Sequence, residues 1–259
     1  MAYTQKIYLG DVPVIKNYLG EDKILSIQTK IDVVSDGLIH YFNSTQNITT
    51  TKWYSNVSNI TGSFAGDSTT YYNSTDKVVE FNSATGTPGL LFGTIPYSPI
   101  YGVPPGQHTV LVYLKPKAEN SLMNFEFMGA SGGGYDPSIN LQLRNDVDST
   151  NYFVLQNEDI LAPYYAKDLG EIATNQFHML GYKLEGTTWN DGVLIHNTDL
   201  LQMTGSAVTP NSSNQYWELG AEGGTGPYSG SIAAVLVYSR ALTSDEIEQN
   251  YFVLSSQFV

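Results

Sequence analysis

The sequence contains no cysteine, few charged residues and no long apolar run. Without cysteine there is neither a disulfide framework nor a thiolate metal site, so packing must hold the fold together. Charged residues make up only 14% of the chain, against roughly 25% in an average globular protein. No apolar segment approaches the roughly 20 residues that are required to cross a bilayer. We therefore expect a protein that is not inserted in a membrane.

Basic residues are also scarce. Lys and Arg total 12 against 25 Asp and Glu, which gives a formal net charge of −13. Nucleic-acid binding requires clustered Lys and Arg, so no nucleic acid is expected as a partner. The negative charge either favours a cation such as calcium or keeps the protein soluble through self-repulsion. No calcium-binding motif is present, and we expect no cofactor.

Short stretches of strand-forming residues alternate with clusters of Gly, Pro, Asn and Ser, a pattern that predicts two stacked antiparallel sheets. The chain of 259 residues has enough apolar material for one large core, and a β-sandwich of this size commonly forms one domain. Strands are predicted at residues 38–43, 78–82, 108–115, 122–128, 139–144, 151–156, 177–184, 192–197, 215–220 and 231–238.

The C-terminal region predicts a strand followed by a helix. Residues 232–238 form an apolar run that is too short for an independent helix and rich in strand formers, which indicates a buried strand. Thr243 begins a Thr-x-x-Glu capping box with Glu246, and Leu242 can pack onto Ile247 as a hydrophobic staple. One capped helical turn is therefore expected after the strand.

Five further segments carry a resemblance through their order and spacing. They are Asp36–Asn43, Thr51–Asn59, Val78–Asn82, Thr109–Pro116 and Glu218–Gly220. Together with the closing strand, they resemble a laminin-G-like, concanavalin A-like lectin-glucanase domain of the kind found in tailed-phage structural proteins. Asn43 stands where that family has Asp. The resemblance implies an all-β fold, a two-sheet antiparallel sandwich with jelly-roll connectivity.

The N-terminal region contains a short repeat, Lys6–Asp11 against Lys16–Glu21, which predicts two small strands with Gly turns. Because an isolated hairpin is marginal in water, we expect residues 1–32 to be an assembly arm that binds other virion proteins. Residues 33–259 would then form the sandwich. A hairpin folded back onto its own sandwich is the alternative. The arm residues predicted to make contacts are Tyr8, Leu9, Tyr18 and Leu19.

Three Gly-rich or Pro-rich loops offer candidate contact surfaces, at residues 95–106, 131–137 and 220–228. Aromatic rings stack on the C–H faces of sugars, while Asp, Asn and backbone groups hydrogen-bond to hydroxyls. The alternative for each loop is a turn whose Tyr packs on the rim of the sandwich. The predicted glycan-binding residues are Tyr97, Tyr101, Tyr135 and Asp136.

Catalytic patterns find little support in the sequence. Ser131 lies in a Gly-x-Ser-x-Gly match, but within a Gly run between strands rather than at a strand-to-helix turn. Glycoside hydrolases of this fold generally present a Glu-x-Asp-x-x-Glu strand, which does not occur here. Each histidine is expected to be a strand residue rather than a zinc ligand. The four histidines are His40, His108, His178 and His196. We expect no catalytic residue, no metal site and no enzymatic activity.

No secretion signal follows Met1. A polar surface protein made without such a signal is explained by synthesis in a host cytoplasm and release on lysis. We expect a non-enzymatic structural protein on the virion surface, either a capsid decoration or a tail or baseplate appendage, assembled as a homo-oligomer and used for host-surface adhesion. The alternatives are a carbohydrate-binding receptor-recognition module, which can coexist with that role, and a glycan hydrolase of the same fold.

Overall fold

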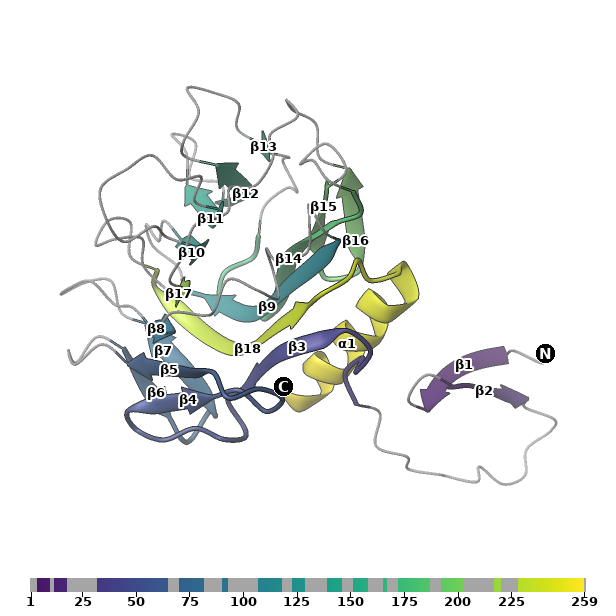
Figure 1. The fold of residues 1–259 in the computed structure, drawn as a ribbon, viewed down its shortest axis with the longest axis horizontal. Coiled ribbons are helices and arrows are strands. Elements are labelled where there is room, and N and C mark those ends of the chain that lie inside the picture. Colours follow the sequence, from purple (N-terminus) through teal and green to yellow (C-terminus); the bar gives the residue numbers. More distant parts are fainter. Residues whose placement is uncertain are drawn as a thin grey trace.

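The protein consists mainly of antiparallel strands with one C-terminal helix (Figure 1). The computed structural model describes residues 32–64, 71–81, 107–117, 172–186, 192–202, 219 and 228–258 in full, and the remaining strand residues through their backbone alone. None of the helical residues that it describes forms a segment long and apolar enough to cross a membrane.

The largest sheet has eight strands and passes through the centre of the molecule (Figure 1). Seven of them follow the order β16-β15-β14-β9-β18-β7-β6. β3 and β7 pair with the same edge of β18, β7 along its first part and β3 along the rest. Their bounds are β3 Leu38–Asn43, β6 Thr70–Asn73, β7 Val78–Phe81, β9 His108–Pro116, β14 His178–Leu184, β15 Gly192–His196, β16 Asp199–Gln202 and β18 Gly230–Tyr238.

Two four-stranded sheets complete the sandwich region, both antiparallel. One has the order β17-β8-β5-β4, with bounds Trp217–Leu219, Leu90–Phe92, Thr61–Phe64 and Lys52–Tyr54. The other has the order β10-β11-β12-β13, with bounds Met123–Met128, Ile139–Asn145, Asn151–Asn157 and Tyr165–Ala166. Each of the ten strands predicted from sequence is confirmed within two residues at either end.

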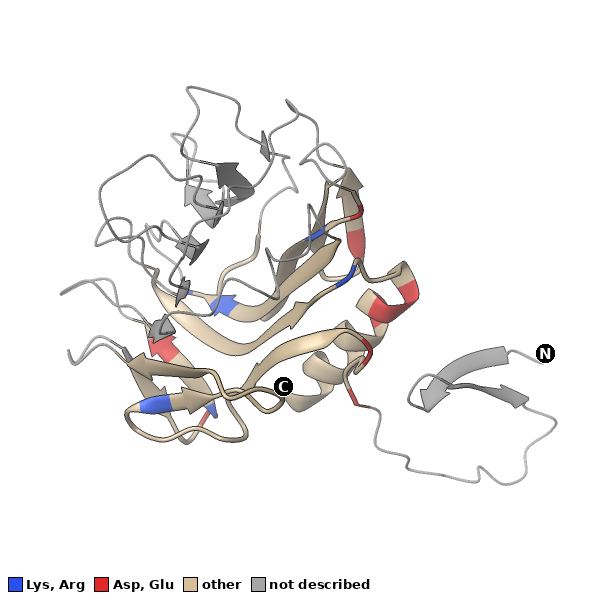
Figure 2. Ribbon diagram, in the orientation of Figure 1, with Lys and Arg blue, Asp and Glu red and all other residues tan. Residues whose placement is uncertain are grey.

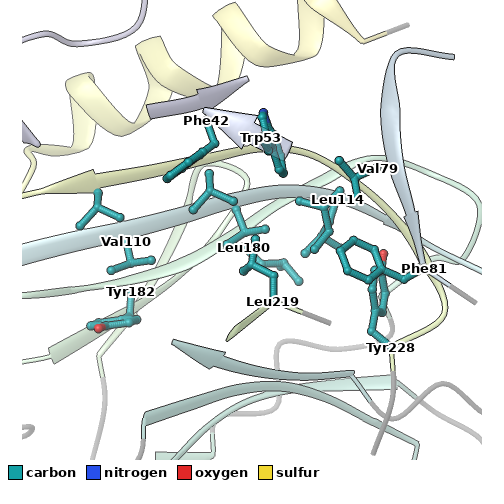
Figure 3. Close-up of a cluster of buried hydrophobic side chains, with 14 of the residues drawn as sticks. Phe42, Trp53, Val79, Phe81, Val110, Leu114, Leu180, Tyr182, Leu219 and Tyr228 are labelled. Carbon is teal, nitrogen blue, oxygen red and sulfur yellow. The ribbon is translucent and has the colours of Figure 1, made fainter. Parts of the chain in front are cut away.

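Both faces of the eight-stranded sheet are buried. Along β9, Val110, Val112 and Leu114 point into the core between the sheets. Leu111 and Tyr113 point to the opposite face and join a second apolar cluster beneath the C-terminal helix. A strand buried on both faces requires an uninterrupted apolar run, which explains the composition of β9 and β18. Figure 3 shows the first cluster, in which Phe42, Trp53, Leu180, Leu219 and their neighbours converge.

The C-terminal helix, α1, spans Ser244–Gln257 and lies against that second cluster. The predicted capping box is confirmed, since the Glu246 N–H donates to Thr243 Oγ1 at 3.3 Å and the Thr243 N–H donates to Glu246 Oε2 at 2.8 Å. Leu242 and Ile247 are both buried in the cluster, as the staple requires. The expectation of a single turn was wrong. The helix continues because Val253, Leu254 and the following Phe258 also bury apolar side chains against the sheet.

The segment that leads into β3 contains two β-branched residues, Val33 and Val34, but they are not in a strand. Hydrogen bonds from α1 and β18 hold this segment instead: the Val34 N–H donates to Asn250 Oδ1 at 2.9 Å, and the Tyr238 hydroxyl donates to the Val34 carbonyl at 3.1 Å. The main-chain groups of Val34 are thereby satisfied without a sheet partner.

The predicted N-terminal strands are confirmed as β1, Thr4–Leu9, and β2, Val12–Asn17, which pair antiparallel. Tyr8 and Leu9 lie at the end of β1, whereas Tyr18 and Leu19 lie outside the described residues. The role of residues 1–32 as an assembly arm stays a prediction.

Candidate functional site

The four predicted glycan-binding residues, Tyr97, Tyr101, Tyr135 and Asp136, lie outside the described residues. The described part of the three loops is Tyr228, whose side chain is fully buried. Its hydroxyl donates to the carbonyls of Lys115 at 3.0 Å and Ser231 at 3.1 Å, and burial raises its pKa well above the ordinary value. For Tyr228, therefore, packing on the sandwich rim is the correct interpretation.

The strands that follow two of the three loops begin at opposite ends of the large sheet. Residues 95–106 lead into β9 at His108, which pairs with Leu184. Residues 220–228 lead into β18 at Gly230, which pairs with Pro116 at the far end of β9.

A different surface combines an exposed aromatic ring with fixed polar groups. In β4, Trp53 points into the core and is fully buried, whereas Tyr54 points outward and is 38% exposed. Gly62 of β5 pairs with Trp53 and is also buried, which leaves Thr61 opposite Tyr54 on the outer face. This alternation follows from the two-residue period of a strand.

Three amide side chains lie next to Tyr54, and we call Gln46, Asn47 and Asn56 the amide cluster. Asn47 Nδ2 donates to Asn56 Oδ1 at 2.9 Å, and Asn56 Nδ2 donates to Gln46 Oε1 at 3.0 Å. The Tyr54 N–H donates to the Asn47 carbonyl at 2.9 Å, which fixes the cluster to β4. An amide offers two donors and two acceptor lone pairs, so each member retains hydrogen-bonding capacity for a ligand.

The turn between β4 and β5 is held against the edge of β3. The Asn56 N–H donates to the Tyr41 carbonyl at 2.6 Å, and the Tyr41 N–H donates to Ser55 Oγ at 3.2 Å. His40 Nδ1 also makes a 2.9 Å hydrogen bond with Ser58 Oγ. These bonds cover the edge of β3 and preorganise the residues around Tyr54, which reduces the entropy that a ligand must overcome.

The segment that carries Tyr54 is nearly uncharged. Lys52 is the single charged residue between positions 44 and 64. Figure 2 shows acidic residues at the start of α1, in contrast to this segment with its single Lys. A segment with one exposed aromatic ring, several amides and hydroxyls and no carboxylate is suited to stacking on a sugar and bonding to its hydroxyl groups.

The sequence contained a signal for this surface that the loop-based prediction missed. Tyr54 and Asn56 lie within the segment Thr51–Asn59 that carries part of the family resemblance. Trp53, in the same segment, is fully buried. A buried Trp53 places its neighbour Tyr54 on the solvent side of the strand.

The histidines are strand residues, as expected, but two of them meet. His178 of β14 and His196 of β15 are 3.1 Å apart between Nδ1 and Nε2. His178 Nε2 donates to the Ala173 carbonyl at 2.8 Å, so its Nδ1 accepts the hydrogen bond from His196 Nε2. Burial lowers the pKa of both rings, and the pKa of His196 is lowered further by His178. Among the described residues, no group of three or more His, Asp or Glu could hold a metal ion.

We predict that the protein loses stability in mild acid. Burial lowers the pKa of His40 from 6.5 to about 4, and the pKa values of His178 and His196 are also lowered. Each of these histidines binds a proton more tightly in the unfolded chain than in the folded protein. Their contribution to the free energy of unfolding is therefore fully present above pH 6.5, and it is lost as the pH falls toward the pKa of the folded state. His40 alone accounts for a loss on the order of 3 kcal/mol. Urea unfolding at several pH values measures this slope, and His40→Gln should flatten it; an unchanged slope in that variant would refute the assignment.

Solved structures share this fold at low sequence identity. Domain 4 of AbnA, a GH43 extracellular arabinanase from Geobacillus stearothermophilus, was solved in complex with arabinotriose; it has a TM-score of 0.60 and 17% identity, over 83% of this chain and 98% of that domain. Trypanosoma rangeli sialidase matches with a TM-score of 0.60 and 14% identity, over 85% of this chain. The binding domain of Botulinum neurotoxin DC in complex with rat synaptotagmin II matches with a TM-score of 0.58 and 12% identity, over 84% of this chain and 52% of the toxin chain. The present chain spans only 33% of the sialidase, so these likenesses concern the fold.

The sequence itself also matches a known family. No curated protein sequence matches the chain at a significant level. A family model described as the concanavalin A-like lectin/glucanases superfamily, Laminin_G_3, matches residues 92–248. This range is more than half of the chain and contains the central strands β9, β14, β15 and β18. This match establishes that the chain belongs to the concanavalin A-like lectin/glucanase superfamily, as the resemblance in its sequence implied.

Proposed function

We propose that this protein is a non-enzymatic structural protein of a tailed-phage particle, and that its lectin-like head binds a host-surface glycan through Tyr54 and the amide cluster. Its N-terminal arm attaches the head to the capsid, tail or baseplate. The observation that supports the binding proposal is an outward Tyr ring on a lectin-type sandwich, with its main chain bonded to a cluster of three amides that Asn56 links together.

The superfamily and one neighbour support a carbohydrate ligand. The arabinanase domain matches over 98% of its own length and was solved with arabinotriose bound. The site on the present chain lies on the β4–β5 hairpin, where Lys52 is the single charged side chain. A chain with a net charge of −13 repels acidic polymers. The ligand that this surface fits best is therefore a neutral oligosaccharide, bound without a metal ion.

Three described carboxylates are held in ion pairs, which favours a structural role for each of them. Glu246 binds the Arg240 guanidinium at 2.6 Å, and this hydrogen bond lowers its pKa below the ordinary value. Glu80 pairs with Lys117 at 3.3 Å, and Glu185 with Lys183 at 2.5 Å. A glycoside hydrolase needs two carboxyl groups free to act on one bond, and paired carboxylates serve structure instead. Release of reducing sugar from a bound glycan would favour the hydrolase alternative.

We predict that Tyr54→Ala lowers glycan affinity about threefold to tenfold, because an aromatic contact contributes about 0.5–1.5 kcal/mol beyond its buried area. The measurement is calorimetric titration with arabinotriose and with neutral host-surface oligosaccharides, in buffer with and without EDTA. Phe252→Ala is the matched control, since Phe252 is an aromatic residue 58% exposed on α1. Equal affinity for wild type and Tyr54→Ala, or an equal loss in Phe252→Ala, would refute the proposed site.

A further inference from the structure

β6 is an edge strand of the large sheet. It is the last strand in the order β16-β15-β14-β9-β18-β7-β6 and pairs with β7 along one side. Its sequence, Thr-Tyr-Tyr-Asn, contains neither proline nor a charged residue. Natural proteins usually protect an edge strand with Lys, Pro, a bulge or a covering loop, because its unpaired backbone groups can bind another strand.

The other described edges carry such protection. The edge of β3 is covered by the turn after β4, through the Asn56 N–H and Ser55 Oγ. β4 begins with the exposed Lys52, and β16 begins with the exposed Asp199. Among these described edges, β6 alone combines an uncharged sequence with a large exposed apolar side chain, Tyr71, which is 48% exposed.

We propose that two copies of this chain dimerise by antiparallel pairing of β6, about a twofold axis perpendicular to the sheet. Such an axis keeps corresponding side chains on the same face, so a residue can lie opposite its own copy. Tyr71 is the most exposed described side chain of β6, and it lies opposite the partner subunit's Tyr71. Cross-strand aromatic pairs stabilise antiparallel sheets, and the two eight-stranded sheets become continuous.

The absence of cysteine provides a direct test of this register. Directly opposite residues in antiparallel strands have Cα atoms about 4.5–5.5 Å apart, which is within the range of a disulfide bond. Tyr71→Cys introduces one cysteine per chain, and mild oxidation should convert most of the protein to a covalent dimer. Tyr54→Cys is the matched control, because Tyr54 is a similarly exposed strand tyrosine on a different sheet; it should remain uncrosslinked.

Sedimentation equilibrium gives the second readout. The wild-type protein should be dimeric at about 100 µM, where even a micromolar complex is largely formed. Tyr71→Lys should be monomeric with unchanged thermal stability, and Tyr54→Lys should remain dimeric. Added salt should tighten the dimer, since each chain has a net charge of −13 and salt screens the repulsion.

Several results would overturn the dimer. They are a monomeric wild type, a trimer or larger ring, a dimer that Tyr71→Lys leaves intact, and crosslinking of Tyr54→Cys as fast as Tyr71→Cys. The dimer does not depend on glycan binding, because Tyr71 lies in the eight-stranded sheet and Tyr54 in the β17-β8-β5-β4 sheet. Loss of binding in Tyr54→Ala without a change of mass would leave the dimer standing.

Discussion

Gly181→Ala is expected to lower the free energy of unfolding by at least about 3 kcal/mol, the upper range for overpacking a core. Gly181 lies in the middle of β14, paired with Leu111 of β9 on one side and Ile195 of β15 on the other. A Cβ atom at this position would contact the carbonyl oxygen of Val110 and the Cα of Leu111, both backbone atoms. The clash can be relieved only if β14 moves away from β9, which breaks the ladder at the centre of the sheet.

Urea unfolding of the purified variant measures this loss, and failure to accumulate in soluble form is the extreme result, because whole domains are stable by only about 5–15 kcal/mol. Gly37→Ala is the comparison. Gly37 has a φ of 74°, and its added Cβ would meet the flexible Arg240 side chain at 2.9 Å. That change should cost about 1 kcal/mol, from the backbone conformation. Equal stability of Gly181→Ala and wild type would mean that β14 and β9 are spaced differently.

Deletion of residues 1–22 should abolish incorporation of the protein into particles while the sandwich stays folded. The deleted segment contains the β1–β2 hairpin, whose strands pair only with each other in the described sheet order. The sandwich is held at its own N-terminal side by Val34, which is buried in the cluster beneath α1 and bonded to Asn250. Comparison of particle composition with and without the deletion measures incorporation.

The control for the deletion is the thermal unfolding of the isolated protein. An unchanged midpoint together with lost incorporation supports the arm as an attachment device. A large drop in the midpoint would instead indicate that the hairpin folds back onto its own sandwich, which is the alternative given by the general tendency of terminal strands to be tied into sheets. Normal incorporation of the deleted protein would refute the arm.

The sequence predicted the long strands well because their composition is dictated by burial. β9 and β18 have nine residues each and are buried along almost their whole length, so apolar runs mark them clearly. The strands β4, β8 and β13 have two or three residues, too few to show alternation. β16 was not predicted. The tight turn that joins it to β15 depends on the backbone conformation of Asn197, whose φ is 55°, and the sequence does not show this conformation directly.

The candidate site was less predictable. Turn composition drew attention to the loops around Tyr97 and Tyr135, whereas the described Tyr54 lies on a three-residue strand. The amide cluster joins Gln46 and Asn47 to Asn56 across nine or ten positions, and only the hairpin brings them together. Likewise, His178 and His196 are separated by 18 positions but meet because β14 and β15 are neighbours. Local sequence patterns do not encode such pairings.

A crystal structure of the wild-type protein with the neutral oligosaccharide that binds best in solution would show directly where the sugar lies. We expect a sugar ring stacked on Tyr54, with its hydroxyl groups bonded to Asn47 and Asn56. A sugar bound elsewhere, such as at the loops around Tyr97 and Tyr135, would contradict the proposed site. The absence of binding to every neutral glycan tested would contradict the adhesive function itself.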